Sequence, residues 1–402
     1  MNFLSKKLKP EKYLGLFILG FIVFSLFYLP YLLFLKGMGE YKSIPDIVEQ
    51  QLAAIKHHKK VIYGSGIRPM NYFYKKELME HIHPQIIAWG SSRVMQFRQK
   101  MFLSKFVNLG GMMTSLDAGL RSYKDIIRAK PKLVLLGIDF WWFNENFQNK
   151  NYKETIAPKL YKPKSSDLLT VRDWLKNGKL TYTDFLKGVL QFPNKGIGVS
   201  GILHEEGFGP DGSYYYTGII TGQKQHHDIG FADTLLRIKT GERRFQYGET
   251  LSKAHFKEFM FLLDEFQRQH IEVILFFPPL AAASNRMINH LSEKYSYIPQ
   301  LKKALKAAGY HYYDYSEPGL IQSSDCEFID GFHGGDVTYA RILKDLAKQE
   351  PELAKYVDMN FLEKSIAQYS GFAYIPDGQF IPGEIDFLEI GCSKGNPQKT
   401  TA

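Results

Sequence analysis

An uninterrupted apolar run near the start of the chain is its strongest hydropathy feature. Residues 13–35 contain no charged side chain, and about 20 apolar residues suffice to span a bilayer as a helix. The basic residues that precede the run are Lys6, Lys7, Lys9 and Lys12. Basic residues mark the cytoplasmic side, and no small-residue cleavage site typical of a signal peptide follows the run. We therefore expect a cytoplasmic tail at residues 1–12, a single transmembrane helix at residues 13–35, and a main domain that is periplasmic or extracellular.

Farther along the chain, short apolar segments alternate with segments of helical period. The predicted strands are residues 85–90, 106–109, 132–140, 271–277 and 311–315. The predicted helices between and after them are residues 115–129, 250–270, 295–308 and 337–349. Strands with apolar centres that alternate with helices are typical of a parallel sheet covered on both faces. The sequence therefore predicts an α/β fold with a doubly wound, mostly parallel sheet of flavodoxin-like topology.

Three regions depart from this alternation. Residues 36–80 are mixed and amphipathic, and we interpret them as a stalk before a domain at residues 81–350. Residues 145–245 show no clear period and are too long for a plain loop, so we expect an inserted lid or cap with some helices. Residues 351–402 are interpreted as a C-terminal appendix, with a hairpin in the Gly- and Pro-rich stretch at residues 372–387.

The charge of the chain limits the classes of partner. The formal net charge is +10, and the basic stretch at residues 150–164 fits either a solvated loop or contact with an anionic envelope polymer or lipid headgroups. Zinc-finger spacing, an arginine-rich helix and RNA-binding aromatic motifs are absent from the sequence, which argues against a nucleic-acid partner. The histidine motifs at residues 81–83 and 226–228 lack a third cluster with metal-ligand spacing. We expect neither a metal nor another cofactor.

The two cysteines of the chain leave open whether it contains a disulfide. Cys326 and Cys392 are the two cysteines of the chain, too few for a disulfide scaffold. They could pair in an oxidising compartment, but the sequence does not show whether their α-carbons approach each other. Pairing stays open at this point.

Reactive side chains follow the predicted strands where those strands end. Ser92 follows the first strand, glycines follow the second, Asp139 follows the third, and Asp330 and His333 follow the last. In a doubly wound sheet, ligands bind beyond the carboxyl ends of the strands. A serine nucleophile needs an imidazole to take its proton, a carboxylate to orient that imidazole, and preset donors for the oxyanion. Each motif alone is also common as a turn or helix cap, but their order on successive strand ends indicates an acyl-transfer site.

These segments resemble the SGNH (GDSL-like) hydrolase superfamily over residues 82–142 and 249–350. In that superfamily the nucleophile lies in a Gly-Asp-Ser or Gly-Ser-Ser turn, and Asp-x-x-His lies near the C-terminal end. The resemblance implies Ser92 as nucleophile, Asp330 as orienting carboxylate and His333 as base. The Gly-Ser-Ser-Arg turn, the N-terminal apolar run and the long insertion look most like the membrane-tethered branch that handles envelope polymers. That branch includes proteins of alginate O-acetylation and teichoic-acid D-alanylation.

The same resemblance implies the residues that bind the oxyanion or the substrate. They are Gly110, Gly111, Met113, Asp139 and Asn144. Met113 takes the place of a glycine whose backbone N–H usually forms part of the hole, and a backbone donor survives that change. Asp139 takes the place of an Asn side chain, and a carboxylate donates no hydrogen bond unless it is protonated. Either Asn144 or Asn146 replaces this donor, or the hole is weaker, or Asp139 serves the fold.

The predicted function is that of a membrane-anchored, extracytoplasmic esterase or O-acyltransferase. It would transfer or hydrolyse an acyl group, with acetyl as the first choice, on a cell-envelope glycan or related polymer, and the insertion would supply the acceptor groove. The expected partners are this polysaccharide or related polymer and the membrane, with a multi-pass membrane acyltransferase as a further candidate. The alternative is a non-catalytic envelope-assembly or polymer-binding scaffold that keeps the SGNH fold, which the carboxylate of Asp139 in the oxyanion position favours.

Overall fold

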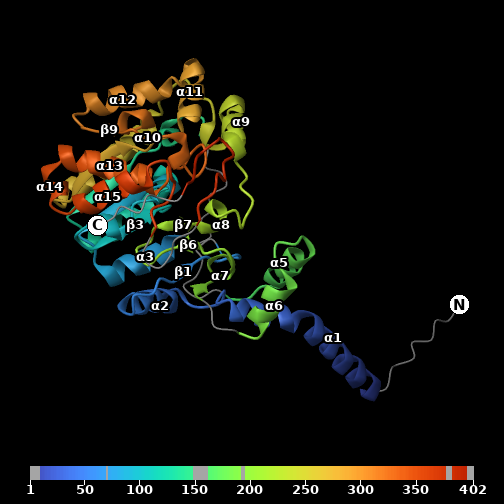
Figure 1. Cartoon of the computed structure of the whole chain (residues 1–402). Coiled ribbons are helices and arrows are strands. Elements are labelled where there is room, and N and C mark those ends of the chain that lie inside the picture. Colours follow the sequence, from blue (N-terminus) through green and yellow to red (C-terminus); the bar gives the residue numbers. More distant parts are fainter. Residues whose placement is uncertain (1–9, 69–70, 148–161, 192–194, 377–382, 396–402) are drawn as a thin grey trace.

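The computed structural model describes residues 10–68, 71–147, 162–191, 195–376 and 383–395. A five-stranded sheet lies at the centre of the fold (Figure 1). Its strands are β2 (Ile86–Gly90), β3 (Phe106–Gly110), β4 (Leu133–Gly137), β8 (Glu272–Phe277) and β9 (Tyr313–Asp314). The spatial order is β3-β2-β4-β8-β9, and every neighbouring pair is parallel. Within the sheet this is the order 2-1-3-4-5 of one common doubly wound arrangement, so the predicted α/β class and mostly parallel sheet are confirmed.

Both faces of this sheet are buried, which explains the near-continuous apolar character of its strands. Successive side chains of a strand point to opposite faces. Along β2, Ile87 and Trp89 belong to one hydrophobic core, and Ile86 and Ala88 belong to the other. The helices on the first face are α4 (Leu116–Ala129), α10 (Lys253–Arg268) and α12 (Tyr297–Ala307). The helices on the second face are α13 (Asp336–Gln349) and α15 (Met359–Tyr369).

Residues 36–80 are part of the globular body, so the prediction of a stalk is wrong. They form α2 (Ile44–Lys56), β1 (Ile62–Tyr63) and α3 (Asn71–Ile82). The apolar faces of both helices lie in the core that covers the first face of the central sheet. β1 pairs with two strands of the inserted region in a second sheet of order β5-β1-β6-β7. The amphipathic pattern was correct, but the partners that bury it come from distant parts of the chain.

The described residues of the inserted region, 145–147, 162–191 and 195–245, are divided between separate places instead of forming one lid. Its strands β5 (Gly196–Ile197), β6 (Glu206–Phe208) and β7 (Tyr214–Tyr216) complete the second sheet, and α9 (Ala232–Thr240) packs against α11 (Ala282–His290). Its helices α5 (Ser165–Lys176) and α6 (Tyr182–Val189) lie beside the C-terminal part of α1 (Pro10–Gly37) (Figure 1). The basic stretch at residues 150–164 falls mostly outside the described residues.

Close contact between α1 and α6 depends on small residues. A Cβ at Gly188 would lie 2.5 Å from the ring of Phe34, and one at Gly37 would lie 2.0 Å from the carbonyl oxygen of Gly188. The ring of Phe185 fills the space alongside, 5.3 Å from that of Phe34 between centroids. The end of α1 is therefore fixed to the body by packing.

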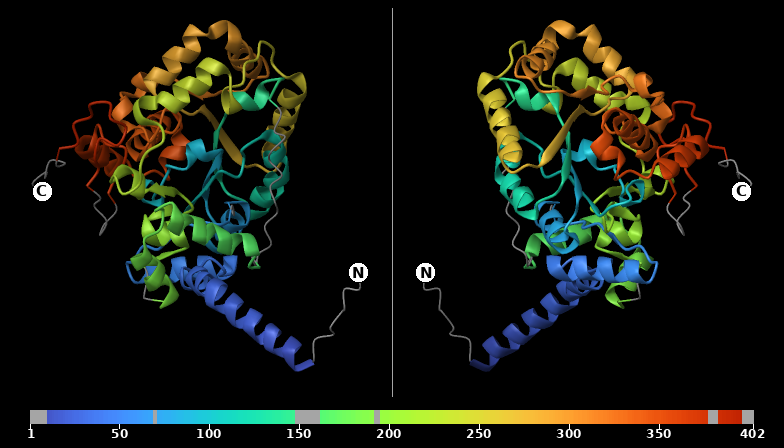
Figure 2. Two further views of the ribbon diagram at one scale, coloured as in Figure 1. Left: turned by 90° about the vertical axis from the view of Figure 1, so that its right-hand side faces the viewer. Right: turned by 90° about the vertical axis from the view of Figure 1, so that its left-hand side faces the viewer.

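The rest of α1 extends away from the body (Figures 1 and 2). Its exposed large apolar side chains are Tyr13, Leu14, Leu16, Phe17, Ile18, Leu19, Phe21, Ile22, Leu26 and Leu29. A helix thus covers the segment for which one was predicted. Within the described part of the chain, no helix is both long enough and apolar enough to cross a membrane.

The described C-terminal residues, 351–376 and 383–395, also belong to the body, so this part of the predicted appendix is not an appendix. Leu353, Val357 and Leu362 are buried in the core on the second face of the sheet. In the predicted hairpin, residues 377–382 lie outside the described residues, and the flanking described residues form no strand. The carboxylate of Glu384 instead accepts hydrogen bonds from the backbone N–H groups of Ala373 and Tyr374. A side chain thus replaces the expected ladder of backbone bonds.

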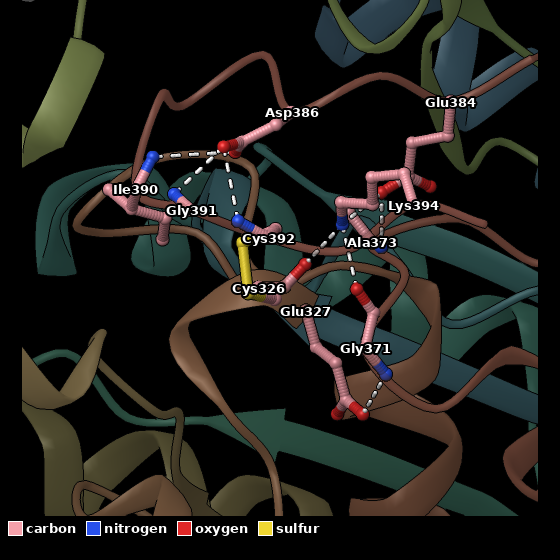
Figure 3. The surroundings of a disulfide bond; sticks show 10 residues. All are labelled: Cys326, Glu327, Gly371, Ala373, Glu384, Asp386, Ile390, Gly391, Cys392 and Lys394. Atoms are coloured by element: carbon pink, nitrogen blue, oxygen red, sulfur yellow. Dashed lines mark hydrogen bonds and ion pairs between the residues drawn. A yellow bond between two sulfur atoms is a disulfide. The ribbon is translucent and has the colours of Figure 1, made fainter.

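A disulfide between Cys326 and Cys392 ties this tail to the segment that precedes α13 (Figure 3). The Asp386 carboxylate accepts the backbone N–H groups of Gly391 and Cys392 at 2.8 and 3.0 Å, which orders the chain around the second cysteine. The Lys394 ammonium pairs with Glu384 at 2.6 Å, and both side chains are almost fully buried. The question of pairing that the sequence left open is answered by this bond.

We expect the double variant C326A/C392A to lose roughly 2–5 kcal/mol of unfolding free energy, because the bond closes a long loop in the unfolded chain. The two cysteines are 66 positions apart. Denaturant unfolding of the variant and of the wild type, each with and without reductant, measures the loss. Reductant should destabilise the wild type and leave the variant unchanged. Equal unfolding midpoints for the oxidised wild type and the variant would contradict a stabilising role.

Candidate active site

The turn after β2 presents Ser92 at the edge of the central sheet. β2 ends at Gly90, where an added Cβ would lie 3.1 Å from the carbonyl oxygen of Gly137 on β4. A glycine therefore lets the chain turn close to the neighbouring strand. Ser91 caps the short 3-10 helix Ser92–Val94, and its Oγ accepts the backbone N–H of Arg93 at 3.2 Å. Ser91 supports the turn, and Ser92 is the first residue inside it.

The structure brings Ser92, Asp330 and His333 together in one hydrogen-bonded series. The Oγ of Ser92 lies 2.9 Å from Nε2 of His333. Nδ1 of His333 lies 2.8 Å from Oδ2 and 3.0 Å from Oδ1 of Asp330. A carboxylate beside Nδ1 holds the imidazole as the tautomer that can accept a proton at Nε2. These three residues therefore have the geometry of a serine nucleophile with its base and orienting acid.

The Asp330 carboxyl is held in its ionised form. Burial alone would raise its pKa, but the charge and hydrogen bond of His333 and the backbone N–H groups of Phe332 and His333 lower the pKa to about 2. The two N–H groups donate to Oδ1 at 2.8 and 2.7 Å. Because the folded pKa lies below the unfolded value of about 3.9, the stability gained is present above that value and is lost as pH falls toward 2.

The inserted region holds the loop that carries the acid and the base, residues 328–334, here called the triad loop. Phe328 and Gly334 form a bridge across its ends. At its tip, the backbone N–H of Gly331 donates to Oδ2 of Asp228 at 2.9 Å. The same carboxylate accepts the hydroxyl of Thr234 at 2.7 Å. Asp228, which the sequence placed in a histidine-rich motif, thus positions the triad loop.

Asp139 is part of a buried ion pair. Its Oδ1 accepts a hydrogen bond from Nη1 of Arg93 at 3.0 Å, and the two side chains are 1% and 2% exposed. Nη2 of Arg93 also donates to the carbonyl oxygens of Pro278 and Pro279. Burial raises the pKa of Asp139, and the charge of Arg93 acts against this rise. Of the two roles left open for Asp139, the structure gives it the one that serves the fold.

Asn144 and Asn146 do not replace the missing oxyanion donor. The buried amide of Asn144 donates to the carbonyl oxygens of Gln246 and Tyr247 at 2.6 and 3.3 Å. The amide of Asn146 also donates to the carbonyl oxygen of Tyr247, at 3.3 Å. Both side chains instead join the segment after β4 to the end of the inserted region. The substrate-binding role predicted for Asn144 is therefore corrected to a structural one.

The backbone donors expected after β3 are also engaged. The N–H of Gly110 donates to Oδ1 of Asn108 at 2.8 Å. The N–H groups of Gly111 and Met113 both donate to the carbonyl oxygen of Gly90, each at 3.0 Å. Buried backbone N–H groups almost always find such partners. Gly110, Gly111 and Met113 therefore lie beside the serine turn, as expected, but their N–H groups shape the turn and are not free to bind an oxyanion.

Arg98 is the most connected polar residue that sequence reasoning missed. Its Nε and Nη2 donate to Oδ1 of Asp336 at 3.0 and 2.7 Å, and its Nη1 donates to Oγ of Ser213 at 2.8 Å. Nη2 also donates to Oε1 of Gln96 and to the carbonyl oxygen of Tyr214. Arg98 thereby joins the segment after the serine turn, the inserted region and the start of α13. The local sequence around Arg98 gives no sign of these distant partners.

The arrangement of the triad is suited to nucleophilic acyl transfer. The assignment of such a site is supported by the geometry of the triad alone. Comparison with known protein families, with characterised proteins and with solved structures finds no match for this chain. Two polar surface pockets, one beside α13 and one near Tyr247, contain no triad residue in their walls. The distances among Ser92, His333 and Asp330 are therefore the observation from which a function can be inferred.

Proposed function

We propose that this protein is an SGNH-type serine esterase or O-acyltransferase. The observation that carries the proposal is the continuous series from Ser92 through His333 to Asp330, with contacts of 2.9 and 2.8 Å. Two further features support it. The serine follows the first strand of a parallel sheet with the doubly wound strand order, and Asp-x-x-His directly precedes α13, which packs on the second face of that sheet. The SGNH resemblance implies both placements.

The proposed reaction forms and then consumes an acyl-enzyme. Oγ of Ser92 attacks the carbonyl carbon of an ester while Nε2 of His333 takes its proton, and Asp330 stabilises the resulting imidazolium. The ester C–O bond breaks, and His333 returns the proton to the leaving alcohol. A second hydroxyl then attacks the acyl-Ser92 ester, again deprotonated by His333, and Ser92 is released with its proton restored. Water as the second nucleophile gives hydrolysis, and a polymer hydroxyl gives transfer. Acetyl is the proposed acyl group and an envelope glycan or related polymer the proposed acceptor.

Covalent labelling with a fluorophosphonate tests this proposal. The reagent reacts with a serine that a neighbouring base activates. The expected result is one added phosphonyl group on the peptide that contains Ser92, and little labelling in H333A. The variant S91A is the control, and it should be labelled like the wild type because Ser91 is not part of the series from Ser92 through His333 to Asp330. Labelling elsewhere, or none in the intact wild type, would reject the catalytic proposal.

A non-catalytic envelope-assembly or polymer-binding scaffold is the second candidate function. One observation favours it, because the backbone donors of Gly111 and Met113 both bind the carbonyl oxygen of Gly90. A scaffold needs no preset oxyanion donors, whereas an esterase does. Absence of phosphonate labelling, together with full function of S92A in the cell, would support the scaffold.

We also propose that α1 anchors the protein in a membrane, with the N-terminus in the cytoplasm and residues after about 36 outside it. The support is the row of exposed apolar side chains along α1 and the lysines that precede the apolar run. The disulfide fits this orientation, because such bonds persist in oxidising compartments outside the cytoplasm. An envelope polysaccharide and a multi-pass membrane acyltransferase are the proposed partners on that side.

Removal of residues 1–28 should convert the protein from membrane-bound to soluble. The truncation removes most exposed apolar side chains of α1 and keeps Phe34 and Leu35, which are buried against the body. Fractionation of cell lysates with and without detergent measures the change, and the full-length chain, expected to need detergent, is the control. Unfolding of the truncated protein should match that of the detergent-extracted full-length protein. A full-length chain that stays soluble without detergent would exclude the anchor.

A further inference from the structure

A short turn at the end of the inserted region is fixed against the triad loop. This turn is η5 (Arg243–Phe245), a 3-10 helix. The buried ring of Phe245 packs edge-on against that of Phe332, with 5.3 Å between centroids. Phe332 lies within the triad loop, and its ring is 4.9 Å from the imidazole of His333. Any side chain that this turn directs toward Phe332 therefore lies close to the proposed catalytic base.

Arg244, the central residue of this turn, directs its guanidinium toward Phe332. The guanidinium carbon lies 5.6 Å from the ring centroids of both Trp141 and Phe332. Arg244 is half-buried, and it forms no hydrogen bond or ion pair with any described residue. Arg93 approaches the same two rings, but its charge is paired with Asp139. The same aromatic surface thus carries one paired and one unpaired guanidinium.

Tyr216 connects Arg244 electrostatically to the triad. Burial raises the pKa of the Tyr216 phenol, the charge of Asp330 raises it further, and the charge of Arg244 lowers it. The phenol is therefore within electrostatic reach of both Asp330 and Arg244. Together with the contacts at Phe332, this places the unpaired guanidinium beside the proposed active site.

The backbone of the turn separates two consecutive arginines. Arg243 has a φ of +55°, in the left-handed region that residues other than glycine rarely adopt. Its side chain is exposed, whereas that of Arg244 lies over the rings. Unusual backbone conformations of this kind occur often at ligand-binding sites. The pair also provides a matched control, because the same charge stands in the same turn in two different environments.

We propose, on the basis of the acyl-transfer function proposed above, that Arg244 binds an anionic group of the acceptor. A guanidinium is always charged and binds a carboxylate or phosphate through two parallel hydrogen bonds. Stacking on aromatic rings orients its plane, so less freedom is lost when an anion binds. The acceptor class is a saccharide or polyol polymer that carries carboxylates or phosphodiesters. Arg244 would hold such a group while a nearby hydroxyl attacks the acyl group on Ser92.

Binding to a protein that cannot turn over separates this proposal from the catalytic one. Calorimetric titration of S92A compares trigalacturonate, a glycerol phosphate trimer and the uncharged galactose trisaccharide. We expect one or both anions to bind more tightly than the neutral sugar. The double variant S92A/R244Q should bind the anion roughly tenfold or more weakly than S92A, because it lacks the charge-assisted pair. The double variant S92A/R243Q should bind the anion with an affinity within twofold of that of S92A, although the substitution removes the same charge.

The outcomes decide between specific and general attraction. A loss of anion affinity with R244Q but not with R243Q supports the proposal. The anion whose binding is weakened then shows whether Arg244 binds a carboxylate or a phosphodiester. Equal losses for both variants, no loss with R244Q, or equal affinity for neutral and anionic ligands would overturn it. Matching unfolding midpoints of R244Q and R243Q exclude misfolding as the cause. Hydrolysis of 4-nitrophenyl acetate, a neutral ester, by protein with Ser92 intact should persist in R243Q. Its absence in the wild type would count against the esterase, while the titration still decides the role of Arg244.

Discussion

The variant S92A is expected to lose turnover of 4-nitrophenyl acetate by a factor on the order of 10⁴ to 10⁶. The substitution removes the Oγ that would form the acyl-enzyme, and no other hydroxyl in the described residues contacts Nε2 of His333. Ser92 is half-buried at the end of a strand and packs little side-chain volume. The free energy of unfolding should therefore stay within about 1 kcal/mol of the wild-type value.

Substitutions of the partners of Ser92 should reduce turnover in a defined order. H333A is expected to lose nearly as much turnover as S92A, and the double variant should lose little more, because members of a triad act as a unit. D330N should lose less than S92A. An Asn Oδ1 can still accept the N–H groups of Phe332 and His333, but the NH2 group in the place of Oδ2 only donates, so Nδ1 of His333 loses its shorter acceptor. The loss then reflects the wrong tautomer of an imidazole that stays in place.

Ser91 provides the control for these variants. S91A removes a cap of the turn and should cost about 1 kcal/mol of stability while keeping most of the turnover. Steady-state kinetics of purified S91A, S92A, H333A and D330N, with unfolding curves for each, measure both quantities. An inactive S91A beside an active S92A would move the nucleophile by one residue. Wild-type turnover in all four variants would remove the catalytic proposal.

Local signals explain why the sheet and the triad could be predicted from the sequence. Each central strand is a short apolar run closed by a turn, and the strand predicted at residues 85–90 is observed at Ile86–Gly90. Asp330 and His333 are three residues apart in one loop, so their contact needs little help from the rest of the fold. The position of Ser92 after the first strand then follows from the rule that sites lie at the carboxyl ends of parallel strands.

The features that could not be predicted depend on contacts between distant segments. The stalk was misread because β1 takes its strand partners from the inserted region. Asp139 looked like part of the oxyanion site until Arg93 was found beside it, 46 positions away in the sequence. Gly111 and Met113 offered N–H groups whose acceptor, the carbonyl oxygen of Gly90, depends on how two strands end side by side. A sequence pattern specifies which groups are polar but not which partner satisfies them.

Among these contacts between distant segments, those of Arg98 should contribute most to the free energy of unfolding. R98A is expected to lower the free energy of unfolding by roughly 3–5 kcal/mol, because it leaves the Asp336 carboxylate buried without its charged partner. The two side chains are 2% and 1% exposed, so water cannot replace the guanidinium. R98K should recover only part of this loss. An ammonium has three donors at one point, whereas Arg98 reaches four acceptor groups with a planar fork.

The stability loss in R98A has two candidate causes, the unpaired Asp336 carboxylate and the lost packing of the Arg98 side chain. Neutralising Asp336 as well separates the two causes. The double variant R98M/D336N should be more stable than R98A, since neither residue then carries an uncompensated charge. R128A is the matched control, because the Arg128 side chain is 70% exposed in its pair with Asp125, and it should change stability by less than about 1 kcal/mol. Urea unfolding of all four variants provides the comparison. Asp336 follows His333 by three residues, so turnover of R98A should fall as its structure loosens. If R98A unfolds like R128A, Arg98 does not hold the start of α13, the inserted region and the segment after the serine turn together.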